Sequence, residues 1–496
     1  MQTRREFVEL LSLAGLSTLV LRGAWSGIPT LARSSTPEDV LIVGAGLAGL
    51  AGLVSAYLLK LAGHRVTILE ARMRPGGRVM TAREPFAEGL HGELGPARIP
   101  ETHERIRAWI AHLGLELEPF DPKSGDRLDV VNGQKIRYRP DAPPDLAAYP
   151  LPFTKEELRL GIAKVAERWA APFEKYASTV TSRDWPPAEL KPYDAITSRE
   201  YTLRRGLSEA VDRYFGLGFE DPGGANFSAL WILRITALSP FERPLARIRG
   251  GMDRLPQAFA RSLTADIRYG APVVAMSQEA NGVTAVIEHR GLRESLHAQR
   301  AIVTAPFPPL RAVEFQPALS PGKQRAIREM QYENLARVLL QLSARPWEKE
   351  GLAGWAKTDL PSEIWHLSHD RPGPRALYGV YLKGSAATAL LGMDEAERVR
   401  YAAMHVDTIF PGVAAAVEGG VSKVWLEDRW AGGAHAGLAP GQVTALMPHA
   451  IVPEGRIHFA GEHTSPWQAW MEGALESGER AALEVNSAGV VNSGTG

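Results

Sequence analysis

A strand, a glycine-rich turn and a helix near the start of the chain constrain its fold more than any other feature. The apolar run 40–43 leads into the turn Gly44-Ala45-Gly46-Leu47-Ala48-Gly49, and the next apolar run ends at Glu70. The three glycines allow a tight bend, the approach of a pyrophosphate to bare backbone, and close packing of the helix on the strand. An acid about twenty residues further along can bind ribose hydroxyls. The pattern predicts an α/β fold with a dinucleotide site, and a purely structural glycine turn is the alternative.

Three further motifs bear on which dinucleotide is bound. Glu70 is followed by Ala71-Arg72 and then by Arg74-Pro75-Gly76-Gly77-Arg78, where guanidinium groups beside a second glycine pair could neutralise a phosphate. An ordinary basic turn would explain Gly76-Gly77 taken alone. Two more motifs stand near the C-terminus, Phe459-Ala460-Gly461-Glu462 and Trp470-Met471-Glu472-Gly473-Ala474.

In this order the motifs resemble the flavin amine oxidase family, closest to its L-amino-acid oxidases. That family carries E-A-x-x-x-x-G-G-R after the first turn and F-A-G-E and W/Y-M-E-G-A near the C-terminus, and the stretch 250–256 resembles its re-entry into the flavin domain. The resemblance spans residues 40 to 485 and implies FAD as cofactor. It implies cofactor contacts from Gly44, Ala45, Gly46, Gly49, Glu70, Ala71, Arg72, Gly77, Arg78, Gly95, Pro96, Ala97, Arg98, Val273, Trp425, Gly461, Glu462, Trp470 and Met471.

The predicted organisation is interleaved. A Rossmann-like FAD-binding domain of the glutathione-reductase type is expected over 38–98, 249–310 and 425–488, and an α+β substrate-binding domain over 99–150 and 311–424. A helical insertion is expected over 151–248. It would begin at Thr154, because Glu157 stands at capping-box spacing, and would place Leu158, Ile162, Val165 and Trp169 on one face. Alternating residues at 273–277 and 283–288 predict strands.

Composition excludes several classes of function. Lys plus Arg and Asp plus Glu number 56 each, so no charge excess favours nucleic acid. The chain has no cysteine, which rules out disulfides and thiolate chemistry, and its scattered histidines predict no metal site.

The N-terminal residues 1–35 are predicted to be an export signal. Thr3-Arg4-Arg5-Glu6-Phe7 resembles a twin-arginine motif, and the apolar run 10–21 that follows is too short to span a bilayer. A periplasmic or secreted location is therefore expected, without stable membrane insertion. A basic amphipathic start is the alternative.

The segment 93–100 indicates the substrate. It reads Glu93-Leu94-Gly95-Pro96-Ala97-Arg98-Ile99-Pro100 and resembles the G-x-M-R-x-P segment of L-amino-acid oxidases and bacterial tryptophan monooxygenases. A guanidinium at Arg98 could hold a substrate carboxylate with two parallel hydrogen bonds. The alternative is an ion pair between Arg98 and an internal acid. Arg98 turned away from the flavin and locked in such a pair would remove the basis for an amino-acid substrate.

The resemblance also bears on seven other positions. Tyr381 would also bind the carboxylate, Trp470 would form an aromatic wall, and the Ala469 carbonyl would receive an amine hydrogen; plain core packing is the alternative for Trp470. The second aromatic wall of amine oxidases is missing, because Ala434 and His435 stand there. Arg337 replaces the usual lysine near flavin N5, which puts oxygen reactivity in question. Lys383 is expected to point to solvent, and the alternative is that it pairs with an acidic or polar side chain of the substrate.

Together these observations predict FAD-dependent oxidative deamination of an L-α-amino acid. The products would be the 2-oxo acid, ammonia and hydrogen peroxide, after hydride transfer from Cα to flavin N5. Four alternatives stay open: an amine oxidase, an amino-acid monooxygenase that releases the amide, a dehydrogenase with poor oxygen reactivity, and a flavin-binding module without turnover. The expected partners are the amino acid and dioxygen, with no nucleic acid, and a homodimer is left open.

Overall fold

The computed structural model describes residues 27–44, 47–142, 144–182, 184–219, 226–238, 244–360 and 362–491. The arginine pair of the predicted export signal lies outside these residues, as do Ala45 and Gly46 of the glycine turn. Within the described residues, no helix has the length and apolar character needed to cross a bilayer.

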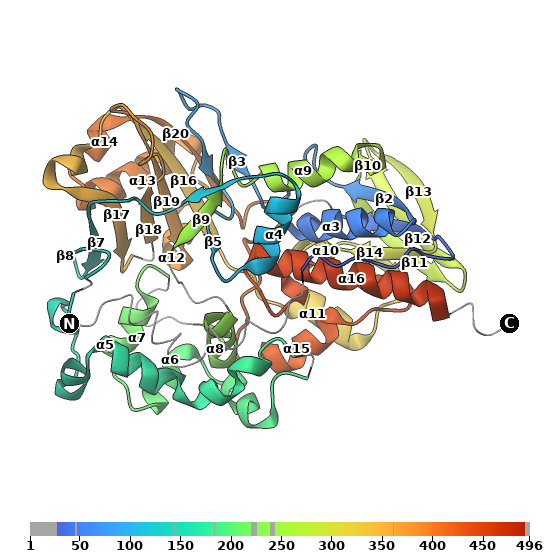
Figure 1. Cartoon of the computed structure of the whole chain (residues 1–496), viewed down its shortest axis with the longest axis horizontal. Coiled ribbons are helices and arrows are strands. Elements are labelled where there is room, and N and C mark those ends of the chain that lie inside the picture. The colour runs from blue at the N-terminus through green and yellow to red at the C-terminus, as the bar shows by residue number, and fades with distance from the viewer. Residues whose placement is uncertain are drawn as a thin grey trace.

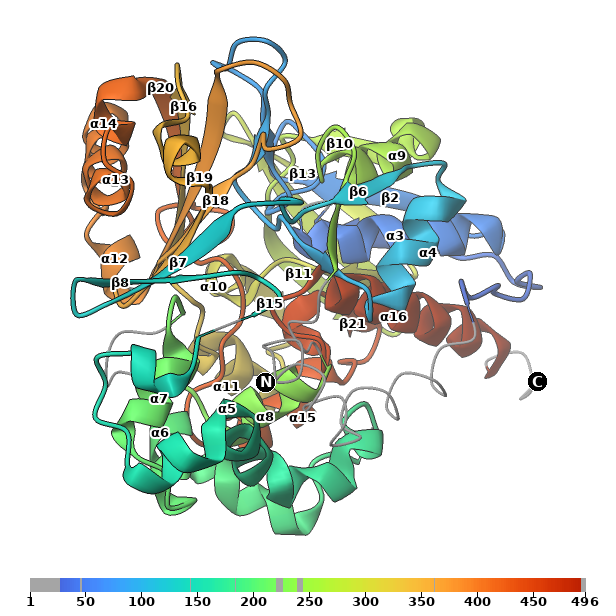
Figure 2. The ribbon, with the colours of Figure 1, turned by 60° about the vertical axis from the view of Figure 1, so that its left-hand side comes forward.

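A five-stranded parallel sheet forms one side of the molecule, at the right in Figure 1, and confirms the predicted α/β fold class. Its order is β10-β2-β1-β14-β21, with strands β1 (Asp39–Val43), β2 (Arg65–Glu70), β10 (Ile267–Tyr269), β14 (Arg300–Val303) and β21 (Ile457–Phe459). Helices α3 (Leu47–Leu61) and α16 (Met471–Val491) pack side by side along it (Figures 1 and 2). Strand β1 is almost wholly buried, as expected for a central parallel strand.

A four-stranded sheet lies beside the parallel sheet. Its order is β13-β12-β11-β15, with strands β11 (Val273–Glu279), β12 (Gly282–His289), β13 (Leu292–Ala298) and β15 (Glu314–Gln316). Strands β11 and β12 confirm the two alternating stretches in the sequence.

A seven-stranded mixed sheet occupies the upper left of Figure 1. Its order is β20-β16-β19-β18-β17-β7-β8, with strands β7 (Asp126–Val131), β8 (Gln134–Tyr138), β16 (Leu335–Leu342), β17 (Leu352–Thr358), β18 (Ser362–His366), β19 (Ala376–Lys383) and β20 (Val417–Val424). Helix α13 (Glu395–Ile409) packs on one face, where Val338 and Val380 join its core. The opposite face carries the neighbouring residues 337 and 381, because side chains alternate along a strand.

Two small sheets connect these parts. Strand β9 (Leu245–Ile248) pairs with β5 (Ile99–Pro100) and β6 (Leu117–Pro119), and β3 (Thr81–Ala82) pairs with β4 (Gly92–Glu93). The turn that bears Arg98 therefore runs between β4 and β5. The remaining α-helices outside the helical part are α4 (Glu104–His112), α9 (Arg254–Ser262), α10 (Phe307–Leu310), α11 (Pro321–Glu329), α12 (Gly384–Thr388), α14 (Val413–Ala416) and α15 (Gln442–Ile451).

A group of helices fills the lower part of Figures 1 and 2. It contains α5 (Lys155–Ala170), α6 (Ser198–Arg204), α7 (Glu209–Gly216) and α8 (Ala229–Leu238). The capping box predicted at Thr154 and Glu157 is confirmed. The predicted apolar face is only partly right: Val165 and Trp169 are buried, but Leu158 is exposed. Gly161 adopts a φ of 73° and kinks the helix between them.

Candidate active site

The carboxyl ends of β1, β2 and β14 meet at one edge of the parallel sheet. Gly44 turns the chain away from β1 with a φ of 111°, and a Cβ atom there would lie 2.8 Å from the Thr304 hydroxyl. That hydroxyl, just beyond β14, donates to the carbonyls of Val43 and Gly44 at 3.1 and 3.0 Å. Only glycine fits a bend with this φ and this neighbour.

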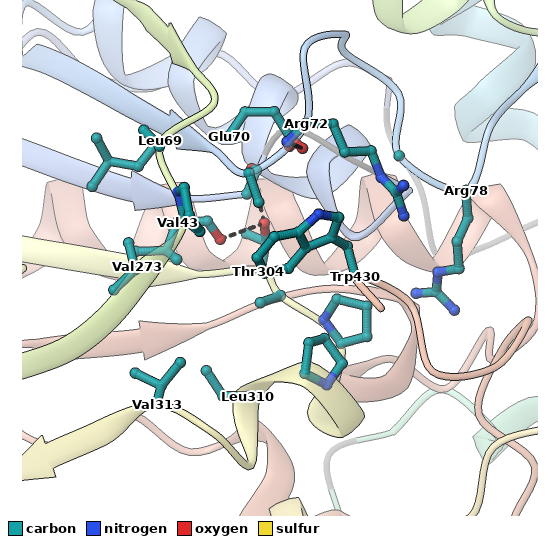
Figure 3. Close-up of a pocket in the computed structure, with 18 residues that line it drawn as sticks. Val43, Leu69, Glu70, Arg72, Arg78, Val273, Thr304, Leu310, Val313 and Trp430 are labelled. Atoms are coloured by element: carbon teal, nitrogen blue, oxygen red, sulfur yellow. Dashed lines mark hydrogen bonds between the residues drawn. The ribbon is translucent and has the colours of Figure 1, made fainter. Parts of the chain in front are cut away.

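A hollow that is partly open to solvent lies at this edge, and we call it the sheet-edge hollow (Figure 3). Seven of the residues predicted to bind the cofactor line it: Gly44, Glu70, Ala71, Arg72, Gly77, Arg78 and Val273. Thr304 and Trp430 also line it, and the sequence did not single them out. Such a hollow beyond the carboxyl ends of parallel strands is where open α/β sheets bind their ligands.

The charged groups at the hollow have different partners. One Glu70 carboxylate oxygen accepts the backbone N–H of Arg72 at 2.8 Å, which fixes the acid at the end of β2. The Arg72 guanidinium bonds Asp428 at 2.5 Å, and Lys423 contacts the same carboxylate. Burial raises the pKa of Asp428, but Arg72 and Lys423 outweigh it and bring the pKa to about 2. Arg74 donates to backbone carbonyls of its own turn and so stabilises that turn, and its approach to a phosphate stays a prediction.

Arg78 and Glu462, far apart in sequence, form a fully buried ion pair. One terminal nitrogen of Arg78 lies 3.0 Å from Glu462 Oε1 and donates to the Ala434 carbonyl at 2.7 Å. Its Nε and second terminal nitrogen are buried and have no hydrogen-bond partner in the described chain. Buried donors left in this way are costly unless a ligand accepts them. Arg78 therefore fits a ligand that brings oxygen or ring-nitrogen acceptors into the hollow.

Glu462 also fixes two segments predicted to contact the substrate. Its Oε2 accepts the backbone N–H of Ala469 at 3.0 Å, and its Oε1 accepts that of Ala436 at 3.3 Å. Ala469 has a φ of 68°, a left-handed conformation that non-glycine residues rarely adopt and that concentrates at functional sites. Next to it, Trp470 packs edge-on against His103 with ring centroids 4.7 Å apart. His435 lies in the same loop as Ala436, and burial lowers its pKa, so its imidazole is neutral.

The turn that follows β4 lies against the same region. A Cβ atom at Gly95 would collide with the Arg78 carbonyl, and the Trp425 indole donates to the Leu94 carbonyl at 2.9 Å. The structure thus brings the Gly95-Pro96-Ala97-Arg98 segment, Trp425 and the Arg78–Glu462 pair together. Three other predicted cofactor residues lie in neighbouring elements. Gly461 directly precedes Glu462, and Gly49 lies in α3. Met471 is the first residue of α16 and packs in the same hydrophobic core as α3.

Strands β16, β19 and β18 place Arg337, Tyr381 and Glu363 in one cross-strand row. Tyr381 is in register with both neighbours, so the three side chains project from the same face. The Arg337 guanidinium lies 3.6 Å from the centroid of the Tyr381 ring and 4.4 Å from that of Trp365. Burial lowers the pKa of Arg337 to about 10, so the group stays cationic at neutral pH.

Arg98 reaches the same row and forms the ion pair that the sequence left as an alternative. Its Nη1 lies 2.8 Å from Glu363 Oε2, and its Nη2 lies 3.4 Å from Oε1. The guanidinium stays within the row, 4.7 Å from the Trp365 ring. The alternative of an ion pair with an internal acid is therefore present in the structure. The binding of a substrate carboxylate by Arg98 stays a prediction and has to be judged together with Glu363.

Lys383 completes this group, contrary to the expectation that it points to solvent. It is 4% exposed, and its Nζ lies 2.7 Å from Glu363 Oε1. Burial lowers the pKa of Lys383 to about 7 against the opposing effect of Glu363. Burial alone would raise the pKa of Glu363, but Arg98 and Lys383 hold it well below its usual value. We call Arg98, Arg337, Glu363, Tyr381 and Lys383 the cationic cluster.

Sequence reasoning missed Glu363 because its partners are distant in the chain. The available signal was an acid at position 363, two positions before Trp365 and so on the same strand face. The described residues contain no group of three His, Asp or Glu side chains arranged to hold a metal ion.

A parallel sheet with a glycine bend, an acid at the end of β2 and unsatisfied donors on Arg78 define a dinucleotide-binding oxidoreductase. The chain belongs to the flavin containing amine oxidoreductase family, whose sequence profile matches residues 50–486. It is a flavin-dependent oxidoreductase, and its cofactor is FAD. The described residues fit this cofactor: Glu70 suits a ribose, the Gly44 bend a pyrophosphate, and Arg78 an acceptor on the nucleotide or the ring.

Relatives with assigned names support the same family. The chain is 34% identical over 479 residues to YobN of Bacillus subtilis (strain 168), a provisional L-amino-acid oxidase, covering 92% of this chain and 96% of the relative. It is 30% identical over 468 residues to the L-amino-acid oxidase of Vipera ammodytes ammodytes, covering 92% and 94%.

Solved structures share the fold. A cyclohexylamine oxidase from Brevibacterium oxydans IH-35A superposes with a TM-score of 0.76 at 23% identity, covering 91% of this chain and 99% of that chain. A putrescine oxidase with bound putrescine gives a TM-score of 0.75 at 21% identity, covering 92% and 100%.

Proposed function

We propose that this protein oxidises an L-α-amino acid. The overall reaction is amino acid plus dioxygen plus water to 2-oxo acid, ammonia and hydrogen peroxide. The observation that carries the proposal is the net positive charge of the cationic cluster. Arg98 and Arg337 are cationic, Lys383 is cationic below its pKa of about 7, and Glu363 supplies the cluster's one negative charge.

Buried charges are stable only when they are balanced, because the interior solvates them poorly. With Lys383 neutral, the cluster carries one positive charge in excess, and a single substrate carboxylate would neutralise it. An amine without a carboxylate would leave that excess in place and could add a further positive charge as its ammonium form. The cluster therefore favours an amino acid over a simple amine, even though Arg98 is already paired with Glu363.

Several residues would then act on the substrate. Arg98 is bonded to Glu363 through two of its nitrogens, and a substrate carboxylate would bind beside that ion pair. Burial raises the pKa of Tyr381, so its hydroxyl remains a hydrogen-bond donor at all working pH values. The Ala469 backbone, held by Glu462, would receive the amine. Bound FAD supplies the two-electron oxidant that converts the amine to an imine, which water then hydrolyses.

The named relatives add independent support, because the L-amino-acid oxidases among them cover more than nine-tenths of this chain. The amine oxidases among the solved structures share its fold at lower identity. An amine oxidase, an amino-acid monooxygenase and a slow-oxygen dehydrogenase are the competing outcomes of the test below.

The test is anaerobic mixing of the FAD-loaded protein with L-amino acids and with the amines that carry the same side chains. We expect bleaching of the flavin by at least one amino acid, and far slower bleaching by its matched amine. The mass of the product then distinguishes a 2-oxo acid from an amide. Admission of air distinguishes reoxidation with peroxide formation from slow reoxidation. Bleaching by amines alone would contradict the proposal.

The variant Arg98→Ala adds a quantitative check. A hydrogen bond to a charged group contributes about 1.5–3 kcal/mol, so kcat/KM for the amino acid should fall about 10- to 150-fold. The low rate with the matched amine should change little, because that substrate makes no use of the guanidinium. Equal losses for both substrates would assign Arg98 a purely structural role.

A further inference from the structure

Glu363 is the centre of the cationic cluster and accepts hydrogen bonds from two of its cations. It is 2% exposed and directly opposite Tyr381 in the sheet. Its two oxygens accept from both terminal nitrogens of Arg98, from Lys383 Nζ at 2.7 Å and from the Trp365 indole at 3.2 Å. These contacts fix the carboxylate from three sides, so its own position is well determined.

The two cations have different second contacts. Lys383 also donates to the Gly218 carbonyl and lies over the Phe219 ring, with Nζ 3.6 Å from its centroid, so it is tied to the helical part of the chain. Arg98 instead extends along the face that carries Tyr381 and Arg337. Arg337 lies over the Tyr381 ring on this face, next to the pair formed by Arg98 and Glu363.

We propose that Glu363 is a positioning residue that aims the Arg98 guanidinium at the substrate carboxylate, while Lys383 offsets the charge of Glu363 so that the site stays attractive to anions. This inference rests on the proposed amino-acid oxidation. It assigns separate tasks to the two residues: Glu363 sets the orientation of Arg98, and Lys383 sets the net charge. Neither residue is required to touch the substrate.

The two tasks predict opposite signatures. In Glu363→Gln the amide keeps the shape but loses the charge that orients Arg98, so kcat should fall about 10- to 100-fold, as expected for a misplaced substrate. Affinity for a simple carboxylate should not fall, because the site becomes more positive. In Lys383→Met the site loses a positive charge, so carboxylate affinity should fall about tenfold below pH 7.

The effect of Lys383 should also depend on pH. In the described part of the chain, the charged and titratable groups that face it are Glu363 on β18, Tyr381 on its own strand, Arg337 on β16, Arg98 from the turn before β5 and His435, with Lys357 of β17 over the same Phe219 ring. Raising the pH from 6 to 8.5 removes the charge of Lys383, so the wild-type protein should lose carboxylate affinity. Lys383→Met should lack this change, and its affinity should equal that of the wild type at pH 8.5.

The experiment uses the FAD-loaded full chain and benzoate as the carboxylate probe. Calorimetry gives the benzoate Kd at pH 6 and 8.5, and steady-state kinetics give kcat and KM for the best amino acid. Glu479→Gln is the matched control, because Glu479 is also buried and also accepts from an arginine, Arg105, and from an indole, that of Trp109. It lies on α16 against α4, away from the cluster, and should change kcat by less than about twofold.

Each result has a definite meaning. The inference is supported if Glu363→Gln lowers kcat and leaves the benzoate affinity unchanged. It also requires that Lys383→Met lowers the benzoate affinity at pH 6 and not at pH 8.5. The inference is overturned if Glu363→Gln has the same kcat as Glu479→Gln. It is also overturned if Lys383→Met has the same benzoate Kd as the wild type at pH 6. A wild-type protein that oxidises amines and not amino acids would refute the proposed function itself.

Discussion

At the scale of single residues, buried charges decide what this protein can bind. The cationic cluster joins three cations to one carboxylate, and Arg78 keeps two buried donors without a partner in the described chain. Both arrangements cost stability by themselves, since buried charges and donors need partners. FAD fits the two donors of Arg78. Under the proposed function, the carboxylate of the substrate would balance the cationic cluster.

Lys323 shows that a buried cation can also be structural. It is fully buried, and its Nζ donates to the carbonyls of Ala450 and Val452 at 2.8 Å, at the end of α15. Burial lowers its pKa to about 7, whereas the unfolded chain has the ordinary value near 10.5. Between these values the unfolded chain binds the proton more strongly, so this residue's contribution to stability rises with pH from 7 to about 10.

The measurement is the urea midpoint of unfolding at pH 7 and pH 9.5 for the wild type and Lys323→Met. We expect the wild-type midpoint to rise with pH relative to that of the variant. The exposed Lys135, on the edge strand β8, supplies the control Lys135→Met, which should follow the wild type. A pH-independent difference between the wild type and Lys323→Met would show that the folded-state pKa of Lys323 is not lowered.

At the scale of elements, local signals fix where strands and helices begin, while tertiary contacts fix which side they bury. The capping box at Thr154 starts α5 as predicted, and the Gly161 kink then turns Leu158 outward. Strands β16 and β19 are almost wholly buried on both faces, so their sequences show no alternation that separates the α13 side from the cluster side. For this reason Lys383 was wrongly placed in solvent.

Removal of the cap gives a prediction at this scale. Thr154→Ala deletes the side-chain oxygen that accepts the Glu157 N–H at 3.2 Å, at a cost of about 1 kcal/mol. Hydrogen exchange in the first turn of α5 should therefore speed up about fivefold, if that turn opens locally. Thr408→Ala, in the exposed part of α13, should leave exchange in α5 unchanged. No change at α5 in Thr154→Ala would mean that tertiary contacts alone hold this turn.

At the scale of the whole molecule, the active site is assembled from stretches hundreds of residues apart. Arg78 meets Glu462 across 384 positions, and Arg98 meets Glu363 across 265. The glycine bend and the acid after β2 could be predicted because the whole signal lies within one strand–helix–strand unit. The partner of Arg98 could not, because ion pairing depends on the register of β18 against β19, which no local pattern specifies. The predicted domain boundaries stay predictions.

The central claim is that the cationic cluster holds a substrate carboxylate while Arg98 remains paired with Glu363. The most direct measurement is a crystal structure of the FAD-loaded protein, reduced with dithionite so that turnover stops, in complex with the amino acid that bleaches the flavin fastest. The account predicts a carboxylate oxygen within about 3.2 Å of an Arg98 nitrogen or the Tyr381 hydroxyl, with Glu363 still bound to Arg98. A carboxylate directed away from Arg98, Arg337 and Tyr381 would contradict it.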